Sequence, residues 1–251
     1  MGDINGVWVD KGSIKTMDLD LHGKLNLLSI AGIFQEGAAE HARHLGVDYY
    51  SLINEDLAWV LSRLYIEIGI LPGWRDGYEL KTWPSGHEGL FAYRDFLLES
   101  PDKSAIARGV SSWIVIHPSK RIPARRHDVF SRFQAAKRER VLDRVPRKIE
   151  GLTVWDSEKE YDVRYHDIDL NGHVNHTYYL QWALESMPFD FLNTNVPVSV
   201  EVNYLAETVF GDGIVCRTKM LDGGGREYLQ SIVNTHNGKE LARIKTVWRD
   251  E

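Results

Sequence analysis

The chain has 251 residues, of which 43% are hydrophobic and 26% are charged, and its formal net charge is −6. This composition indicates a soluble, folded protein that can bury two sizeable cores or one continuous core. The single cysteine, Cys216, excludes an intrachain disulfide and any metal site built from several cysteines. No run of eighteen apolar residues occurs, and MGDINGVWVDKG at the N-terminus lacks the regions of a signal peptide, so we expect a cytoplasmic protein without a membrane partner.

The first half of the chain is typical of one helix followed by four strands. The segment LNLLSIAGIFQEGAAEHARHLG, residues 25–46, places apolar residues at helical spacing, and its final Gly46 is a suitable C-terminal stop. Four alternating apolar segments follow at 57–70, 78–83, 91–99 and 105–116. The intervening PGWRDG, PSGHEG and SPDKS have turn compositions.

A basic segment separates the two halves. Residues 120–148 contain eleven Lys and Arg residues against three acids. One interpretation is a solvated linker helix, since FSRFQAAKRERVLDRV within it has apolar residues at helical spacing. The other is a positive patch that attracts an acidic, phosphate-carrying partner. No nucleic-acid motif accompanies the patch, so we predict no nucleic-acid partner.

The second half repeats the pattern of the first. A helix is expected over about residues 175–186, and alternating strands over 198–207, 213–221, 227–235 and 240–249. DGGG and HNG supply hairpin turns between the later strands. One long helix wrapped by an antiparallel sheet is the hot-dog arrangement. The sequence therefore predicts an α+β protein with two hot-dog domains in tandem.

The two halves are diverged copies of one domain. DLHGKLN in the first half aligns with DLNGHVN in the second, and each half later carries an Ala-Arg pair with a Trp five residues after the Arg. Units this long that occur twice indicate a duplicated domain rather than a solenoid. His22 and Lys24 stand where the second copy has Asn171 and His173. We infer that one copy kept its chemistry and the other lost it.

The motif of the second copy places three polar residues at alternate positions. In extended chain, Asp169, Asn171 and His173 point to one side, directly before a helix N-terminus. Unpaired N–H groups at a helix start suit a carbonyl oxygen that becomes an oxyanion, so the pattern suggests acyl chemistry. The alternative is a turn and helix cap with no catalytic role, because Asp, Asn and Gly are the commonest turn residues.

The sequence resembles the acyl-acyl carrier protein (acyl-ACP) thioesterases, a family of plant plastid enzymes and shorter bacterial relatives. LAWVLSRLYIEI, GYELKTW, YRDFLLE, DIDLNGHVNHTYYLQWALE and NYLAET carry the resemblance, and this chain looks like a bacterial-type member. The resemblance assigns catalysis to Asp169, Asn171, His173 and Glu207. Many plant members have a cysteine directly after that glutamate, where this chain has Thr208.

The missing cysteine bears on the mechanism. A cysteine nucleophile needs a thiolate near an imidazole, and Thr208 cannot form one. We expect water attack with Glu207 or His173 as general base, Asn171 as donor to the thioester oxygen beside a backbone N–H near Val174 or Asn175, and Asp169 as the orienting group. A covalent anhydride through Glu207 is the alternative.

The resemblance also implies a domain plan and a substrate. We predict a degenerate N-terminal hot-dog domain at residues 1–118 that shapes an acyl pocket, a basic linker at 119–157 and a catalytic hot-dog domain at 158–251. The expected substrate is a fatty acyl chain on the phosphopantetheine arm of acidic acyl carrier protein, with no cofactor or metal. Alternatives are an acyl-CoA thioesterase and a non-catalytic acyl-binding protein. A homodimer is compatible with the sequence.

Overall fold

The computed structural model describes residues 2–124, 127–132, 136, 138–221, 223–224 and 226–250. The chain divides into two compact units, the first ending at Pro146 and the second beginning at Arg147. This division falls inside the segment expected to be a linker. No helix in the described part of the chain combines the length and the apolar character that spanning a bilayer requires.

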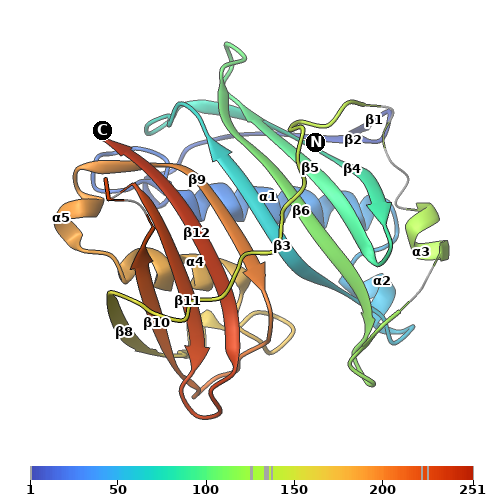
Figure 1. Cartoon of the computed structure of the whole chain (residues 1–251). Helices are drawn as coiled ribbons and strands as arrows, with labels where there is room; N and C mark the ends of the chain where they lie inside the picture. Colours follow the sequence, from blue (N-terminus) through green and yellow to red (C-terminus); the bar gives the residue numbers. More distant parts are fainter. Residues whose placement is uncertain are drawn as a thin grey trace. The chain divides into compact units, whose positions relative to one another are not determined.

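The first unit contains one long helix and an antiparallel sheet (Figure 1). The sheet has the order β1-β2-β4-β5-β6-β3, and the short β7 pairs with β6. The helices are α1 (Leu27–His44), α2 (Tyr49–Ile53) and α3 (His127–Arg132), with a 3₁₀ turn at Thr16–Asp18. The strands are β1 (Gly2–Ile4), β2 (Val7–Ser13), β3 (Ala58–Ile68), β4 (Gly77–Glu88), β5 (Phe91–Glu99), β6 (Ala105–His117) and β7 (Ile122–Pro123).

The sequence explains where α1 begins, ends and packs. The side-chain oxygen of Asn26 accepts a hydrogen bond from the Ser29 N–H at 2.8 Å, which caps the N-terminus. Gly46 follows the helix at φ +66°, a left-handed conformation that glycine adopts without strain, as predicted. One face of α1 is buried on the sheet, where Phe34 stacks on Phe96 of β5 with ring centroids 4.6 Å apart.

The second unit has the same architecture. Its sheet runs β8-β10-β11-β12-β9, which matches β2-β4-β5-β6-β3 strand for strand, and α4 takes the place of α1. The elements are β8 (Ser157–Asp162), a 3₁₀ turn at Tyr165–Asp167, α4 (His176–Glu185), α5 (Phe189–Leu192), β9 (Asn195–Tyr204), β10 (Gly213–Met220), β11 (Glu227–Asn234) and β12 (Glu240–Asp250). The prediction of two hot-dog domains in tandem is therefore confirmed.

The duplication extends to single hydrogen bonds. The indole Nε1–H of Trp113 on β6 donates to the Ser111 hydroxyl at 2.7 Å. At the equivalent place on β12, Trp248 donates to the Thr246 hydroxyl at 2.8 Å. Both tryptophans belong to the Ala-Arg-to-Trp repeat seen in the sequence, so the structure confirms that alignment.

Two local predictions were wrong or incomplete. PSGHEG was expected to be a turn, but β4 continues through most of it to Glu88, and a register shift between Pro84 and Gly86 absorbs the irregular composition. The strands β2 and β8 were not predicted. In β8 every side chain except that of Tyr161 is exposed, so this edge strand lacks the apolar alternation that identifies a strand.

Arginines of the basic segment lie on aromatic rings of the first sheet. Each guanidinium carbon lies over a ring: Arg138 over Trp83 (4.4 Å to the centroid), Arg140 over Tyr93 (5.1 Å) and Arg144 over Tyr65 (3.8 Å). The Val141 N–H donates to the buried Asp95 carboxylate at 2.7 Å. Within the described residues, α3 is the part of the basic segment that is helical, and residues 138–146 are irregular. Arg125 and Arg126, also expected in the positive patch, lie outside the described residues.

A buried polar chain joins β1, α1 and β5 in the first unit. His41 of α1 is fully buried, with Nε2 3.1 Å from the Asp3 carboxylate and Nδ1 3.1 Å from the Arg94 guanidinium. Burial, with a further contribution from Arg94, lowers the pKa of His41 to about 4. The imidazole is therefore neutral at pH 7 and bridges an acid to a guanidinium.

Candidate active site

The motif of the second unit forms a tight loop that leads into α4. The Asp169 N–H donates to the His173 carbonyl at 2.8 Å, and the Gly172 N–H donates back to the Asp169 carbonyl at 3.0 Å. Gly172 has φ +76°, which favours glycine at this turn. Asn175 caps α4 by accepting the Thr177 N–H at 3.0 Å. The motif is thus a turn and a cap, and the expectation of an extended segment with Asp169, Asn171 and His173 on one side was wrong.

Asp169 orients the amide of Asn171. One carboxylate oxygen accepts the Asn171 backbone N–H at 2.7 Å, and the other lies 3.4 Å from the Asn171 side-chain nitrogen. A side-chain amide carries two N–H donors, so the second N–H of Asn171 can bond a substrate oxygen. The contacts of Asp169 therefore support its expected orienting role, directed toward the Asn171 side chain.

His173 and Glu207 form the second half of the site. His173 Nε2 lies 3.4 Å from Glu207 Oε2, and the two side chains are 33% and 42% exposed. An imidazole and a carboxylate at this distance, both open to solvent, can hold a water molecule and accept its proton. The structure thus pairs Asp169 with Asn171 and His173 with Glu207, and a backbone hydrogen bond between Asp169 and His173 links the two pairs.

The residues on either side of Glu207 are fixed by contacts that the sequence did not reveal. The buried Tyr179 donates its hydroxyl to the Ala206 carbonyl at 3.5 Å, and burial raises the pKa of this phenol, which stays protonated. On the other side, the Thr208 carbonyl accepts the Val174 N–H at 3.0 Å. These bonds join the loop that carries Glu207 to the motif, and no spacing in the sequence signals them.

The suggested backbone oxyanion donors were wrong. The N–H of Val174 is bonded to Thr208, and the N–H of Asn175 donates to the Asp167 carbonyl at 2.8 Å. Neither donor is available to a thioester oxygen. The Asn171 amide is the donor of the predicted set that remains available.

Neither Thr208 nor Cys216 is available as a nucleophile. Thr208 is buried, and its hydroxyl donates to the Asp212 carboxylate at 2.7 Å. Cys216 is fully buried in β10, and burial raises the pKa of its thiol to about 11. Among the described residues no cluster of three or more His, Cys, Asp or Glu side chains can hold a metal ion.

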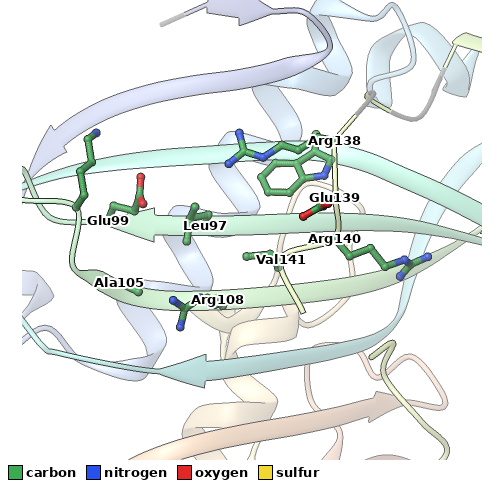
Figure 2. A pocket seen from close by; sticks show the side chains of 10 residues that line it. Leu97, Glu99, Ala105, Arg108, Arg138, Glu139, Arg140 and Val141 are labelled. Carbon is green, nitrogen blue, oxygen red and sulfur yellow. The ribbon is translucent and has the colours of Figure 1, made fainter. Parts of the chain in front are cut away.

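The first unit carries a separate cleft, with a volume of about 440 Å³ (Figure 2). Arg138 and Arg108 lie on either side of Leu97 in this view. The lining residues are Trp83, Leu97, Glu99, Lys103, Ala105, Arg108, Arg138, Glu139, Arg140 and Val141, none of them from the motif. None of these lining residues supplies an imidazole, a hydroxyl or a thiol.

Comparison with known families matches both units. The acyl-ACP thioesterase N-terminal domain model matches residues 7–132, and the C-terminal domain model matches residues 153–250. The chain is 26% identical over 254 residues to a chloroplastic acyl-[acyl-carrier-protein] hydrolase of Cuphea viscosissima. That alignment covers 94% of this chain but only 61% of the relative. The chain thus spans about three fifths of the length of this curated relative.

Solved structures match the whole fold. A crystal structure of an acyl-ACP thioesterase from Bacteroides thetaiotaomicron has a TM-score of 0.86 at 23% identity and covers 98% of both chains. The 12:0-ACP thioesterase from Umbellularia californica has a TM-score of 0.89 at 21% identity and covers 100% of both. At these identities the likeness establishes the tandem hot-dog fold.

Proposed function

The chain belongs to the acyl-ACP thioesterase family, and from this membership we propose that it hydrolyses the thioester of fatty acyl-acyl carrier protein and releases free fatty acid. The observation that carries the proposal is the His173–Glu207 pair at 3.4 Å, whose imidazole shares a motif loop with the Asn171 amide that Asp169 contacts, in the copy that keeps the family motif. In the first copy, Lys24 occupies the position of the imidazole.

The proposed reaction is direct attack by water. Glu207 accepts a proton from a water molecule positioned by His173, and the water oxygen bonds to the thioester carbon. The Asn171 amide, oriented by Asp169, stabilises the oxyanion that forms. The carbon–sulfur bond then breaks, and the leaving sulfur takes the proton back from Glu207. His173 as general base, and an anhydride formed by Glu207, are the competing schemes.

The proposed partner is acyl carrier protein, whose acidic surface would be attracted to positive charge on this chain. The first unit is proposed to shape the pocket for the acyl chain, since it keeps the helix and sheet without the chemistry. The expected domain boundaries, cytoplasmic location and homodimer stay predictions.

A hydrolysis panel tests this function. The purified protein is given acyl-ACP and acyl-CoA substrates of matched chain lengths, with His173→Ala as the inactive control. Faster hydrolysis of acyl-ACP supports the proposal, and faster hydrolysis of acyl-CoA would make the chain an acyl-CoA thioesterase. Binding of acyl chains with no hydrolysis would indicate an acyl-binding protein. In ¹⁸O-labelled water, a single turnover by water attack places the label in the fatty acid, whereas an anhydride opened at the enzyme carbonyl labels Glu207.

A further inference from the structure

Large apolar side chains are exposed around the His173–Glu207 pair. They come from the 3₁₀ turn, from the motif loop and from the loop that carries Glu207, and we call them the apolar rim: Tyr165 (77% exposed), Leu170 (65%), Leu205 (47%), Val209 (44%) and Phe210 (66%). Single exposed apolar residues are ordinary, but several on neighbouring loops mark an interaction surface.

Backbone hydrogen bonds join these loops into one surface. The Val174 N–H donates to Thr208, which sets the motif loop beside the loop of Glu207. Gly211, directly after Phe210, donates its N–H to the Val163 carbonyl at 3.3 Å, and the 3₁₀ turn begins two residues after Val163. The apolar rim is therefore continuous with the catalytic pair.

The carboxylates of the same loops are bonded within the loops. Asp167 accepts the Arg164 N–H at 2.7 Å, and Asp212 accepts the Thr208 hydroxyl at 2.7 Å and the Val209 N–H at 3.2 Å. Asp169 is likewise bonded to Asn171. With these acids occupied, the exposed side chains of the loops are the five of the apolar rim and those of Arg164, His166, Asn171 and Glu207.

We propose that the apolar rim is the docking surface for the acyl carrier protein, an inference that rests on the proposed function. The reacting carbonyl must come within hydrogen-bond reach of His173 and Glu207, so the carrier binds within one phosphopantetheine arm of this pair, and the loops of the apolar rim border the pair. Small ligands bind in concave sites, whereas the rim side chains project. Exposed aromatic anchors such as Tyr165 and Phe210 are typical of the centre of a protein–protein contact.

The duplication supplies a matched control surface. In the first unit, Leu21 (61% exposed) and Trp74 (55%) occupy the positions of Leu170 and Phe210. Their loops are joined in the same way, since the Leu25 N–H donates to the Pro72 carbonyl at 2.9 Å. This surface has the same construction but lacks the catalytic pair, so changes there should have the same effect on folding and none on docking.

The experiment compares a rim variant, Leu170→Ser with Phe210→Ser, with the control variant, Leu21→Ser with Trp74→Ser. Each is assayed on acyl-ACP and on the acyl-phosphopantetheine thioester, which has the same arm without the protein. We expect the rim variant to raise KM for acyl-ACP at least about tenfold, as loss of an interface anchor does. Its kcat/KM on the protein-free thioester should stay within about twofold of wild type. The control variant should match wild type on both substrates, and equal melting temperatures would show that both variants fold.

Four outcomes would overturn the docking surface. An unchanged KM for acyl-ACP in the rim variant would show that the carrier protein does not bind to the apolar rim. An equal loss on both substrates assigns the rim to the phosphopantetheine arm, and an equal loss in the control variant shows a general effect of the substitutions. If the wild-type protein hydrolyses no acyl-ACP at all, the proposed function fails first, and the docking surface fails with it.

Discussion

Replacement of Glu207 by alanine should lower kcat strongly but change the free energy of unfolding only slightly. The two losses can therefore be measured separately. The Glu207 carboxylate lies 3.4 Å from His173, and the two side chains are 42% and 33% exposed. A solvent-exposed contact between an imidazole and a carboxylate contributes no more than an exposed ion pair does, which is about 0–1 kcal/mol of the free energy of unfolding. For a protein of this size, about 1 kcal/mol corresponds to a shift in Tm of about 2–4 °C. We therefore expect Glu207→Ala to lower Tm by no more than about 4 °C.

The expected loss of activity is much larger. A positioned acid or base contributes about 10²–10⁴ in rate, or about 2.7–5.4 kcal/mol of activation free energy. Glu207→Ala and His173→Ala should each lower kcat at least about a hundredfold. Because the two residues act as a unit, the double variant should be little worse than the poorer single variant.

The assay is fatty-acid release from acyl-ACP at saturating substrate, together with thermal unfolding followed by circular dichroism. Glu158→Ala is the matched control, since Glu158 forms an exposed ion pair with Arg217 at 3.5 Å in the same unit, outside the site. A folded Glu207→Ala variant that keeps more than about a tenth of kcat would refute Glu207 as the base. A fall in Tm of about 10 °C would instead show that the pair is structural.

Three further predictions follow from buried groups. Cys216→Ser should keep most of its acyl-ACP hydrolysis, because a thiol with a pKa of about 11 is protonated at pH 7, and full inactivation of a folded variant would contradict water attack. The pKa of His41 is lowered from 6.5 to about 4 in the folded protein. Between these pH values the unfolded chain binds a proton at His41 that the folded chain does not bind. The free energy of unfolding should therefore fall as pH decreases from about 6.5 to 4. His41→Gln should flatten that part of a Tm-against-pH curve, and an unchanged slope would exclude His41 as its source. Gly37→Leu should lower Tm because a Cβ there would overlap the Leu80 side chain, whereas Gly32→Leu, with no heavy atom within 4 Å of its Cβ, should change Tm much less. Thermal unfolding of the two variants checks this, and an equal fall in Tm would contradict it.

The parts of the fold that follow from local pattern could be predicted from the sequence. The helix ending at Gly46 and the strand at 91–99 show clear periodicity, and the structure has both. The exposed edge strand β8 shows none, so a local pattern could not reveal it. The positions of Arg138 and Arg140 could not be predicted either, because rings from β4 and β5 that bind them become neighbours only in the folded sheet.

The candidate site likewise contains residues that the sequence could identify and contacts that it could not. Asp169, Asn171 and His173 are close in sequence, and their alternate spacing drew attention to them. Glu207 lies beyond β9 and was connected to His173 only by the family resemblance, because a tertiary contact leaves no periodicity. The bonding of the Val174 and Asn175 N–H groups depends on where the loop of Glu207 and the 3₁₀ turn lie, so their unavailability could not be predicted from spacing.

The motif loop is held by bonds that do not involve its reactive side chains. In the first unit the Asp20 N–H donates to the Lys24 carbonyl at 2.8 Å, the same bond that Asp169 makes to His173 in the second. The imidazole can therefore be lost by mutational drift while the loop keeps its shape, and a duplicated gene can specialise one copy without first passing through a misfolded intermediate. Few substitutions would restore the lost groups. With Asp20 already present, His22→Asn, Lys24→His and Leu71→Glu would give the first unit the same four side chains as the second.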